Sequence, residues 1–205
     1  MTIEIKNLNK QYNNIVAVKN INFKINKGSI VGLLGPNGCG KTTTIGMILG
    51  LLKPTSGQVL INGKNIENNK ISILHKMNFI SPYIELPKKL TVKQNLIVYG
   101  KLYNIKNLSE RINFLSEKLR LEDLLDKITG ELSSGQKNRV SLAKALINDP
   151  TVLLLDEPTA ALDPETADFI RTFLEKLREE KKISVLLASH NMDEVKRLCL
   201  SLIHI

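Results

Sequence analysis

A glycine-rich stretch near the start of the chain has the residue types and spacing of a phosphate-binding loop. It reads GPNGCGKT and fits the pattern G-x-x-x-x-G-K-[ST]. Its glycines let backbone N–H groups close around phosphate oxygens, and a helix N-terminus adds positive potential. Lys41 can reach the outer phosphates, and Thr42 can bind Mg²⁺. The predicted phosphate-binding residues are Gly35, Pro36, Asn37, Gly38, Cys39, Gly40, Lys41, Thr42 and Thr43.

A pair of carboxylates follows the apolar run VLLL and could act on the same phosphates. Asp156 and Glu157 stand at the carboxyl end of a predicted buried strand, which is where open α/β sheets bind ligands. Successive strand residues point in opposite directions, so Asp156 can face Mg²⁺ while Glu157 turns toward an attacking water as its general base. The pair predicts hydrolysis rather than binding alone. A pair standing by itself would more simply be a helix cap or a surface turn.

The elements that must position these groups follow from the hydrophobic pattern. The alternating stretches IEIKNL and AVKNINFKI predict two antiparallel strands with one solvated face. The runs SIVGLLG, TVLLLDE and KISVLLASH are apolar throughout, as strands covered on both faces of a parallel sheet are. Helical spacing predicts helices over 41–52 and from Pro164 to about Glu180, and VLING predicts another short strand and turn.

A helical region interrupts this alternation. From Thr91 to about Asp126, apolar residues recur at intervals of three and four residues, which predicts helices. Breaks between these helices are expected near Gly100, Asn104 and Asn107. The predicted fold is an α/β P-loop NTPase core with a mostly parallel sheet, an N-terminal antiparallel β subdomain and a helical insert over about 84–145. Because no repeat or linker is evident, we expect one domain over 1–205.

Composition limits the partners and the compartment. The 205 residues carry a net charge of +9, but basic residues are adjacent only in pairs, which favours a lysine-rich surface over a site for nucleic acid or anionic lipid. Cys39 and Cys199 match no disulfide or metal spacing, so a reducing compartment is expected. The start lacks a signal-peptide core, and no apolar run reaches the ~18 residues that a membrane span needs. We therefore expect any membrane role to depend on a partner.

Another motif lies between the phosphate loop and the carboxylate strand. The sequence ELSSGQ, which ends at Gln136, resembles the L-S-G-G-Q signature of the ATP-binding cassette (ABC) family, with Ser134 in place of the first glycine. The resemblance runs from about Ile3 to Leu198. It assigns Ala161-Leu162-Asp163 to the D-loop, His190 to the switch histidine, and Tyr12 to the aromatic residue that stacks on adenine. Taken singly, Tyr12 would be ordinary packing and His190 a helix cap.

The resemblance implies how the site is completed. Two cassettes of this family face each other, so a second ATP-binding subunit is expected, either identical or different. The signature residues that act on the partner's site are Ser133, Ser134, Gly135 and Gln136. The first three would contact the γ-phosphate of ATP held by that partner, with donors placed around a spread negative charge. ATP and Mg²⁺ are the expected cofactors. Glu157, His190 and Lys41 would be catalytic, and Asp156 would bind the metal through a water.

The same resemblance implies an ATPase at the cytoplasmic face of the cell membrane that powers a separate polytopic membrane subunit. The segment SPYIELP-x-x-LTV resembles cassettes of exporters. Two alternatives stay open. One is a soluble family member acting on ribosomes or DNA, although direct nucleic-acid binding is not expected, and the other is a regulatory nucleotide binder that does not hydrolyse ATP.

Two features depart from the family pattern. Pro82 stands where relatives place a glutamine that reaches Mg²⁺, and Gln94 lies too far along the chain to replace it. After Cys199 the chain ends sooner than its relatives do, and the last residues, 201–205, are expected to form a shortened strand. The sequence identifies neither the cargo nor the direction of transport.

Overall fold

The apolar run Ile30–Leu34 forms the buried strand β3 in the computed structural model, which describes residues 2–82 and 84–204. β3 pairs in parallel with β8 (Ser184–Ser189) on one side and with β9 (Ser201–His204) on the other. β9 falls where the shortened last strand is expected, and its register to β3 is regular from Val31 to Leu34.

Two further parallel strands complete this sheet. β7 (Val152–Asp156) pairs with β8, and β6 (Met77–Ile80) pairs with β7, which gives the strand order β6-β7-β8-β3-β9. Every pairing in this sheet is parallel, so β3 and β7 end at the same edge. That edge is where the two predicted phosphate-site motifs begin.

The N-terminal strands form a separate antiparallel sheet, as the alternating pattern predicts. Its order is β2-β1-β4-β5, made of β1 (Ile3–Tyr12), β2 (Ile15–Ile25), β4 (Ser56–Ile61) and β5 (Lys64–Asn65). Ile3, Ile5 and Leu8 on β1 are buried, while the residues between them are more exposed. The sheet therefore has one face against the core and one toward solvent.

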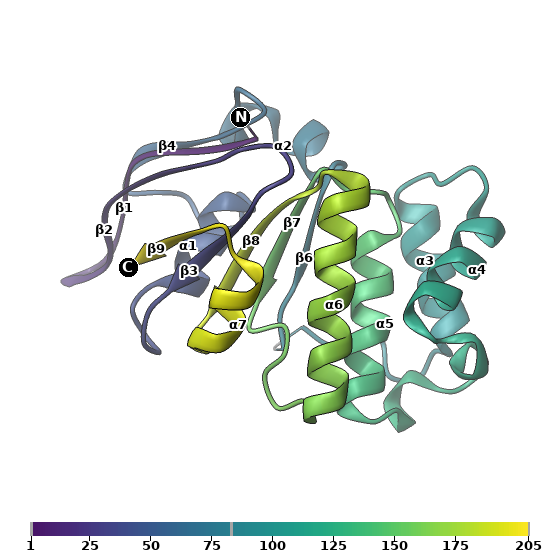
Figure 1. The fold of residues 1–205 in the computed structure, drawn as a ribbon. Helices are drawn as coiled ribbons and strands as arrows, with labels where there is room; N and C mark the ends of the chain where they lie inside the picture. Colours follow the sequence, from purple (N-terminus) through teal and green to yellow (C-terminus); the bar gives the residue numbers. More distant parts are fainter. Residues whose placement is uncertain (1, 83, 205) are drawn as a thin grey trace.

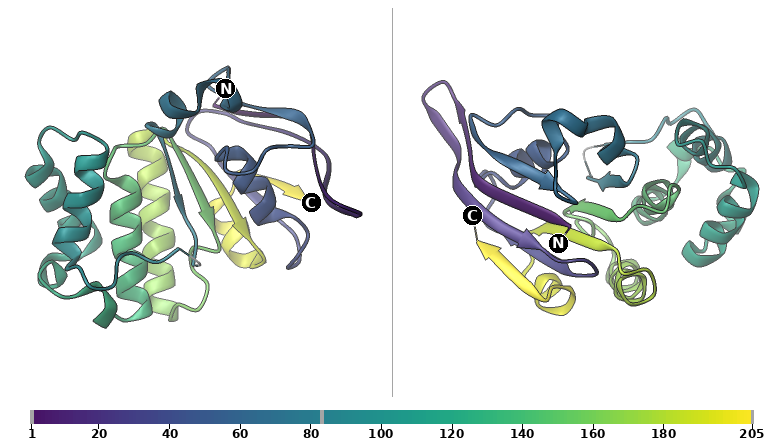
Figure 2. Two further views of the ribbon diagram at one scale, coloured as in Figure 1. Left: turned by 180° about the vertical axis from the view of Figure 1, so that it is seen from behind. Right: turned by 90° about the horizontal axis from the view of Figure 1, so that it is seen from above.

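Seven α-helices and two 3₁₀ turns surround the sheets within the described residues. They are α1 (Lys41–Ile48), α2 (Ile66–Leu74), α3 (Val92–Leu102), α4 (Leu108–Leu119), η1 (Glu122–Leu124), η2 (Thr129–Glu131), α5 (Ser134–Leu146), α6 (Pro164–Lys181) and α7 (Met192–Leu198). Figures 1 and 2 show α3 and α4 at one end of the molecule, the antiparallel sheet at the other, and α5 and α6 between them. No helix in the described part of the chain is long and apolar enough to cross a membrane.

The parallel sheet divides two hydrophobic cores, which explains why its strands are apolar throughout. Along β7, Leu153 and Leu155 pack with the core that includes α3 to α6, whereas Val152 and Leu154 pack with the core beneath α1 and the antiparallel sheet. Adjacent strand residues point to opposite faces, so a strand covered on both sides has no solvated position.

One expectation about a helix boundary is wrong, and the breaks in the helical insert fall near the expected residues. The helix predicted over 41–52 ends at Ile48, because Gly50 adopts φ +64° and the N–H of Leu51 bonds back to the Gly46 carbonyl in a glycine C-cap. As expected, Asn104 and Asn107 lie in the break between α3 and α4, and Gly100 lies close to it, in the last turn of α3. A Cβ there would be 2.0 Å from Leu108, so glycine permits the close packing of α4.

Candidate functional site

The phosphate loop connects β3 to α1, and its conformation depends on glycine at a particular point. Gly40 precedes α1 with φ +104°, and a Cβ at this position would lie 2.4 Å from the backbone carbonyl of Ala17 on β2. Positive φ and the close approach both exclude larger residues. The loop is therefore held against the antiparallel sheet as well as between its own strand and helix.

Lys41 lies within the curve of this loop. Its Nζ donates to the carbonyl oxygens of Gly35, at 2.6 Å, and Pro36, at 3.0 Å, and the residue is buried. It helps line an open cavity of about 310 Å³. The cavity is lined by Ala17, Asn37, Gly38, Gly40, Lys41, Thr42, Thr43, Asp156 and Glu157. The loop and the two carboxylates, more than a hundred residues apart in sequence, thus form one site.

Thr42 and Asp156 meet inside this cavity. Thr42 Oγ1 donates to Asp156 Oδ2 at 3.0 Å, and Asp156 is only 2% exposed. Burial raises the pKa of the Asp156 carboxyl, while the hydrogen bond from Thr42 acts in the opposite direction. A hydroxyl and a carboxylate at this separation supply hard oxygen atoms, which fit Mg²⁺.

Glu157 follows the end of β7 in a left-handed conformation, with φ +50°. Its Oε1 accepts the backbone N–H of His190 at 3.0 Å and lies 2.8 Å from His190 Nδ1. Because an ionised carboxylate only accepts hydrogen bonds, Nδ1 carries the imidazole proton here. The backbone turn and this contact direct Glu157 toward the end of β8, so the predicted base and the predicted switch histidine are in direct contact.

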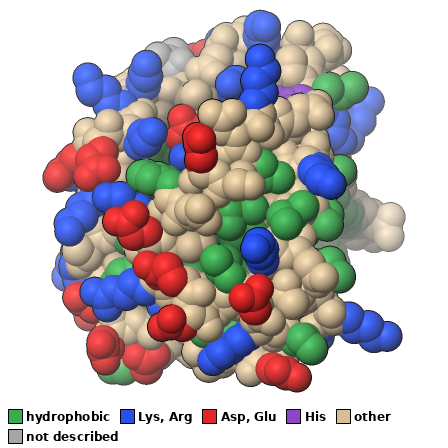
Figure 3. Space-filling model, turned by 90° about the vertical axis from the view of Figure 1, so that its right-hand side faces the viewer, with side chains coloured by type: hydrophobic (Ala, Val, Ile, Leu, Met, Phe, Trp, Pro, Cys, Tyr) green, Lys and Arg blue, Asp and Glu red, His purple; other side chains and the backbone are tan. Residues whose placement is uncertain are grey.

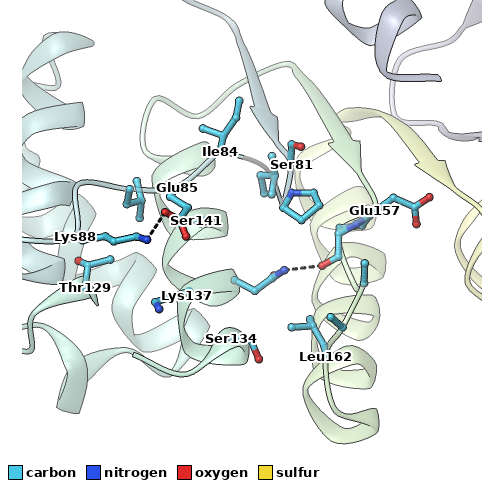
Figure 4. A pocket seen from close by; sticks show the side chains of 17 residues that line it. Ser81, Ile84, Glu85, Lys88, Thr129, Ser134, Lys137, Ser141, Glu157 and Leu162 are labelled. Atoms are coloured by element: carbon cyan, nitrogen blue, oxygen red, sulfur yellow. Dashed lines mark hydrogen bonds and ion pairs between the residues drawn. The ribbon is translucent and has the colours of Figure 1, made fainter. Parts of the chain in front are cut away.

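The signature segment starts α5 at a distance from the phosphate loop. Ser133 is the N-cap of α5, and it forms a reciprocal capping box with Gln136. Ser134 lines a second pocket, of about 220 Å³, whose opposite side includes Glu157 (Figure 4). Ser134 does not line the phosphate-loop cavity, so the structure does not bring signature and loop together within this chain.

Three other predicted residues have clear positions. Asp163 caps α6 by accepting the N–H of Thr166 at 2.9 Å, and this bond lowers the pKa of its carboxyl. Tyr12 is 43% exposed at the end of β1, with Lys10 Nζ 4.8 Å from its ring centre, and does not line the phosphate-loop cavity. Pro82 is exposed beside the second pocket.

Sequence reasoning missed two parts of the site. Ala17 lines the phosphate-loop cavity although nothing in its type or spacing indicates this. A buried polar cluster of Thr159, Ser189 and Glu194 adjoins Glu157 and His190. A carboxylate in the first turn of a helix is normally read as exposed, so only the three-dimensional packing identifies Glu194.

Comparison with known proteins agrees with this geometry. The sequence pattern of the ABC transporter family matches residues 18–160. The Nod factor export ATP-binding protein I of Burkholderia orbicola is 36% identical over 199 residues, which are 96% of this chain and 65% of that protein. The bacitracin transport ATP-binding protein BcrA of Bacillus licheniformis is 38% identical, over 96% of this chain and 64% of its own length. The chain thus spans slightly under two thirds of the length of these two relatives.

A solved structure gives the same fold. The dimeric structure of MJ0796, described as a bacterial ABC transporter cassette, superimposes with a TM-score of 0.90 at 29% identity. The alignment covers 99% of this chain and 94% of that one. A second structure of that cassette is described as a dimer in a post-hydrolysis state, bound to ADP and Pi.

Proposed function

Because the chain belongs to the ABC transporter family, we propose that it is an ATPase subunit that powers a separate membrane-spanning subunit, as part of an exporter. The observation that carries this proposal is the convergence of Lys41, Thr42, Asp156 and Glu157 on one cavity. A nucleotide binder without hydrolysis needs no second carboxylate beside the one that holds Mg²⁺. Glu157 at that position favours turnover.

The phosphate loop and its neighbours would bind the triphosphate of ATP. The first residues of α1 line the cavity, and a helix N-terminus favours anions. Lys41 adds a buried positive charge that can leave the loop carbonyls for phosphate oxygens. Thr42 would hold Mg²⁺ directly and Asp156 would hold it through a water. When bound, this ion neutralises charge on the β- and γ-phosphates.

Glu157 would accept a proton from the water that attacks the γ-phosphate. His190 fixes one carboxylate oxygen by two N–H groups, which leaves the orientation of Glu157 little freedom. A second copy or a related subunit would complete the site with its own Ser133, Ser134, Gly135 and Gln136. Its Asp163 would lie near the interface. The dimeric structures of the MJ0796 cassette support this assembly.

The end of the molecule formed by α3 and α4 would bind the membrane subunit. Figure 3 shows hydrophobic side chains gathered among charged ones on this face. Exposed residues of this region include Ile84 on the entry loop and Val98 and Leu102 on α3. Exposed apolar side chains that cluster in this way are typical of protein interfaces. We infer a location at the cytoplasmic face of the membrane, and the relatives' names favour transport over action on ribosomes or DNA.

The experiment that tests this function is Mg²⁺-dependent ATP hydrolysis by wild type and Glu157→Gln. Glutamine has nearly the shape of glutamate and Lys41 is unchanged, so the variant should bind ATP normally. It should hydrolyse ATP about 10²–10⁴-fold more slowly, because the base is lost. Lys41→Ala is the matched control, because it should weaken ATP binding itself. Turnover by Glu157→Gln within a few-fold of wild type would exclude the assigned base. Co-purification with a polytopic membrane protein tests the partner.

A further inference from the structure

Glu194 is a buried carboxylate next to the proposed catalytic pair. It lies in the first turn of α7, is 1% exposed, and accepts hydrogen bonds from two hydroxyls. Thr159 Oγ1 donates to its Oε1 at 2.6 Å, and Ser189 Oγ donates to its Oε2 at 2.7 Å. Burying a carboxylate costs free energy unless each of its oxygens accepts a hydrogen bond. Glu194 therefore uses the hydroxyl protons of both Thr159 and Ser189.

Ser189 also lies beside Glu157, and its hydroxyl has one proton to donate. Ser189 Oγ is 2.7 Å from Glu194 Oε2 but 3.5 Å from Glu157 Oε2, and it accepts the backbone N–H of Asn191 at 3.1 Å. The Ser189 proton therefore lies in the shorter contact, toward Glu194, because hydrogen bonds weaken steeply beyond about 3.2 Å. Ser189 therefore presents a lone pair, not a proton, to Glu157.

This arrangement distinguishes the two oxygens of Glu157. Oε1 receives two N–H groups from His190. Within residues 2–82 and 84–204, the only hydrogen-bond contact of Oε2 is the 3.5 Å approach of Ser189 Oγ. A carboxylate oxygen without a donor keeps its lone pairs for an incoming proton, whereas a donor bound there would stabilise the ionised form and weaken the base.

We propose that Glu194 is a positioning residue that holds the Ser189 proton away from Glu157, so that Glu157 Oε2 remains an acceptor for the attacking water. This inference rests on the proposed role of Glu157 as general base. Glu194 touches neither ATP nor water in this role. It acts through Ser189, and Thr159 secures the other oxygen of Glu194 so that its carboxylate faces Ser189.

The test compares ATP turnover by purified protein at saturating MgATP in a set of variants. Glu194→Met keeps an unbranched side chain of similar length but removes both acceptors, so the Ser189 proton should turn to Glu157. The kcat should then fall about tenfold or more, the effect of one hydrogen bond to a carboxylate. The KM for ATP should stay within about twofold, because no phosphate-binding group changes. Glu194→Gln, whose carbonyl can still accept from Ser189, should keep most of the wild-type kcat.

A second substitution distinguishes this role from a merely structural one. Adding Ser189→Ala to Glu194→Met removes the misdirected proton, so the double variant should turn over faster than Glu194→Met alone. The matched control adds Thr159→Val instead, which removes the other hydroxyl and should restore nothing. A structural role predicts that both double variants are as slow as Glu194→Met or slower. That result would overturn the inference, and so would an unchanged kcat in Glu194→Met.

Glu157→Gln, assayed in the same series, separates this inference from the proposed function. If Glu157→Gln is slow but Ser189→Ala fails to rescue Glu194→Met, the base assignment stands and the role of Glu194 is wrong. If Glu157→Gln keeps its turnover, the base assignment fails and the role of Glu194 fails with it.

Discussion

His190 Nδ1 lies 2.8 Å from Glu157 Oε1, and the backbone N–H of His190 donates to the same oxygen at 3.0 Å. The two residues follow neighbouring parallel strands, β7 and β8, at the edge where both strands end. Their contact therefore depends on sheet register as much as on side-chain chemistry. Two donors on one oxygen also restrict the rotation of the Glu157 carboxylate.

His190→Ala should lower ATP turnover by about 10- to 100-fold, the cost of losing one hydrogen bond to a charged group at a reacting residue. The backbone N–H remains, so the loss should be smaller than that of Glu157→Gln. Single-turnover hydrolysis with ATP bound in advance measures the chemical step directly. A rate equal to wild type would show that the imidazole contact has no part in catalysis.

Asp156→Asn should stabilise the protein while reducing Mg²⁺-dependent turnover. Burial raises the pKa of this carboxyl above its ordinary 3.8, so ionisation opposes folding. This free-energy cost of folding is absent at pH values well below the ordinary pKa. It grows as the pH rises through the pKa of Asp156 in the folded protein, and it is complete above that pKa. The variant's gain in Tm, measured without nucleotide, should therefore be larger at pH 7 than near pH 4. An equal gain at both pH values would indicate a packing effect instead.

Pro82→Gln should lower the Mg²⁺ concentration that gives half-maximal turnover. Pro82 offers no side-chain oxygen, whereas glutamine at this position could supply a ligand or bind a metal-bound water. Ser81→Ala is the neighbouring control and should change the Mg²⁺ dependence little, because we expect Ser81 to stabilise the turn. Titrations are made with the membrane partner present. If neither substitution changes the Mg²⁺ concentration that gives half-maximal turnover, another group replaces the missing glutamine.

The two cysteines should differ in their reaction with maleimide at neutral pH. Cys199 is partly buried, and this burial, with a smaller effect from Glu194, raises the pKa of its thiol to about 12. Cys39 lies in the phosphate loop just before α1 and directly follows the exposed residues 36–38. Wild type and Cys199→Ser should be labelled, ATP should block the labelling, and Cys39→Ser should resist it. An unlabelled wild type without nucleotide would mean that Cys39 serves only as a small residue.

The sequence predicts that the loop and the carboxylate pair lie together, because each of these parts is local, whereas phosphate binding there stays a prediction. The loop from Gly35 to Thr42 and the pair Asp156-Glu157 each follow an apolar strand, and parallel strands bring such ends to one edge without further information. The contact between Thr42 and Asp156 follows from those two facts. The assignment of Tyr12 to adenine and of the signature to a partner subunit rests on resemblance and stays a prediction.

Other features depend on packing that no short pattern encodes. The helix α2 was not predicted, since only Ile66 and Ile73 in it are buried and a kink at Asn69 disturbs its period. The role of Glu194 is equally hidden, because its partner Thr159 lies 35 residues earlier. Gly100 shows the same limit, since its neighbour on α4 determines whether glycine breaks a helix or fits one.

The place of β3 in the sheet has a consequence for synthesis of the chain. β3 carries the phosphate loop, yet both its partners, β8 and β9, leave the ribosome about 150 residues later or more. At typical elongation rates this apolar strand waits roughly 8–30 s with both edges unpaired. Unpaired apolar strands are prone to associate with other chains. The nascent protein therefore depends on early burial of β3 against the antiparallel sheet, or on a chaperone, well before it can bind a nucleotide.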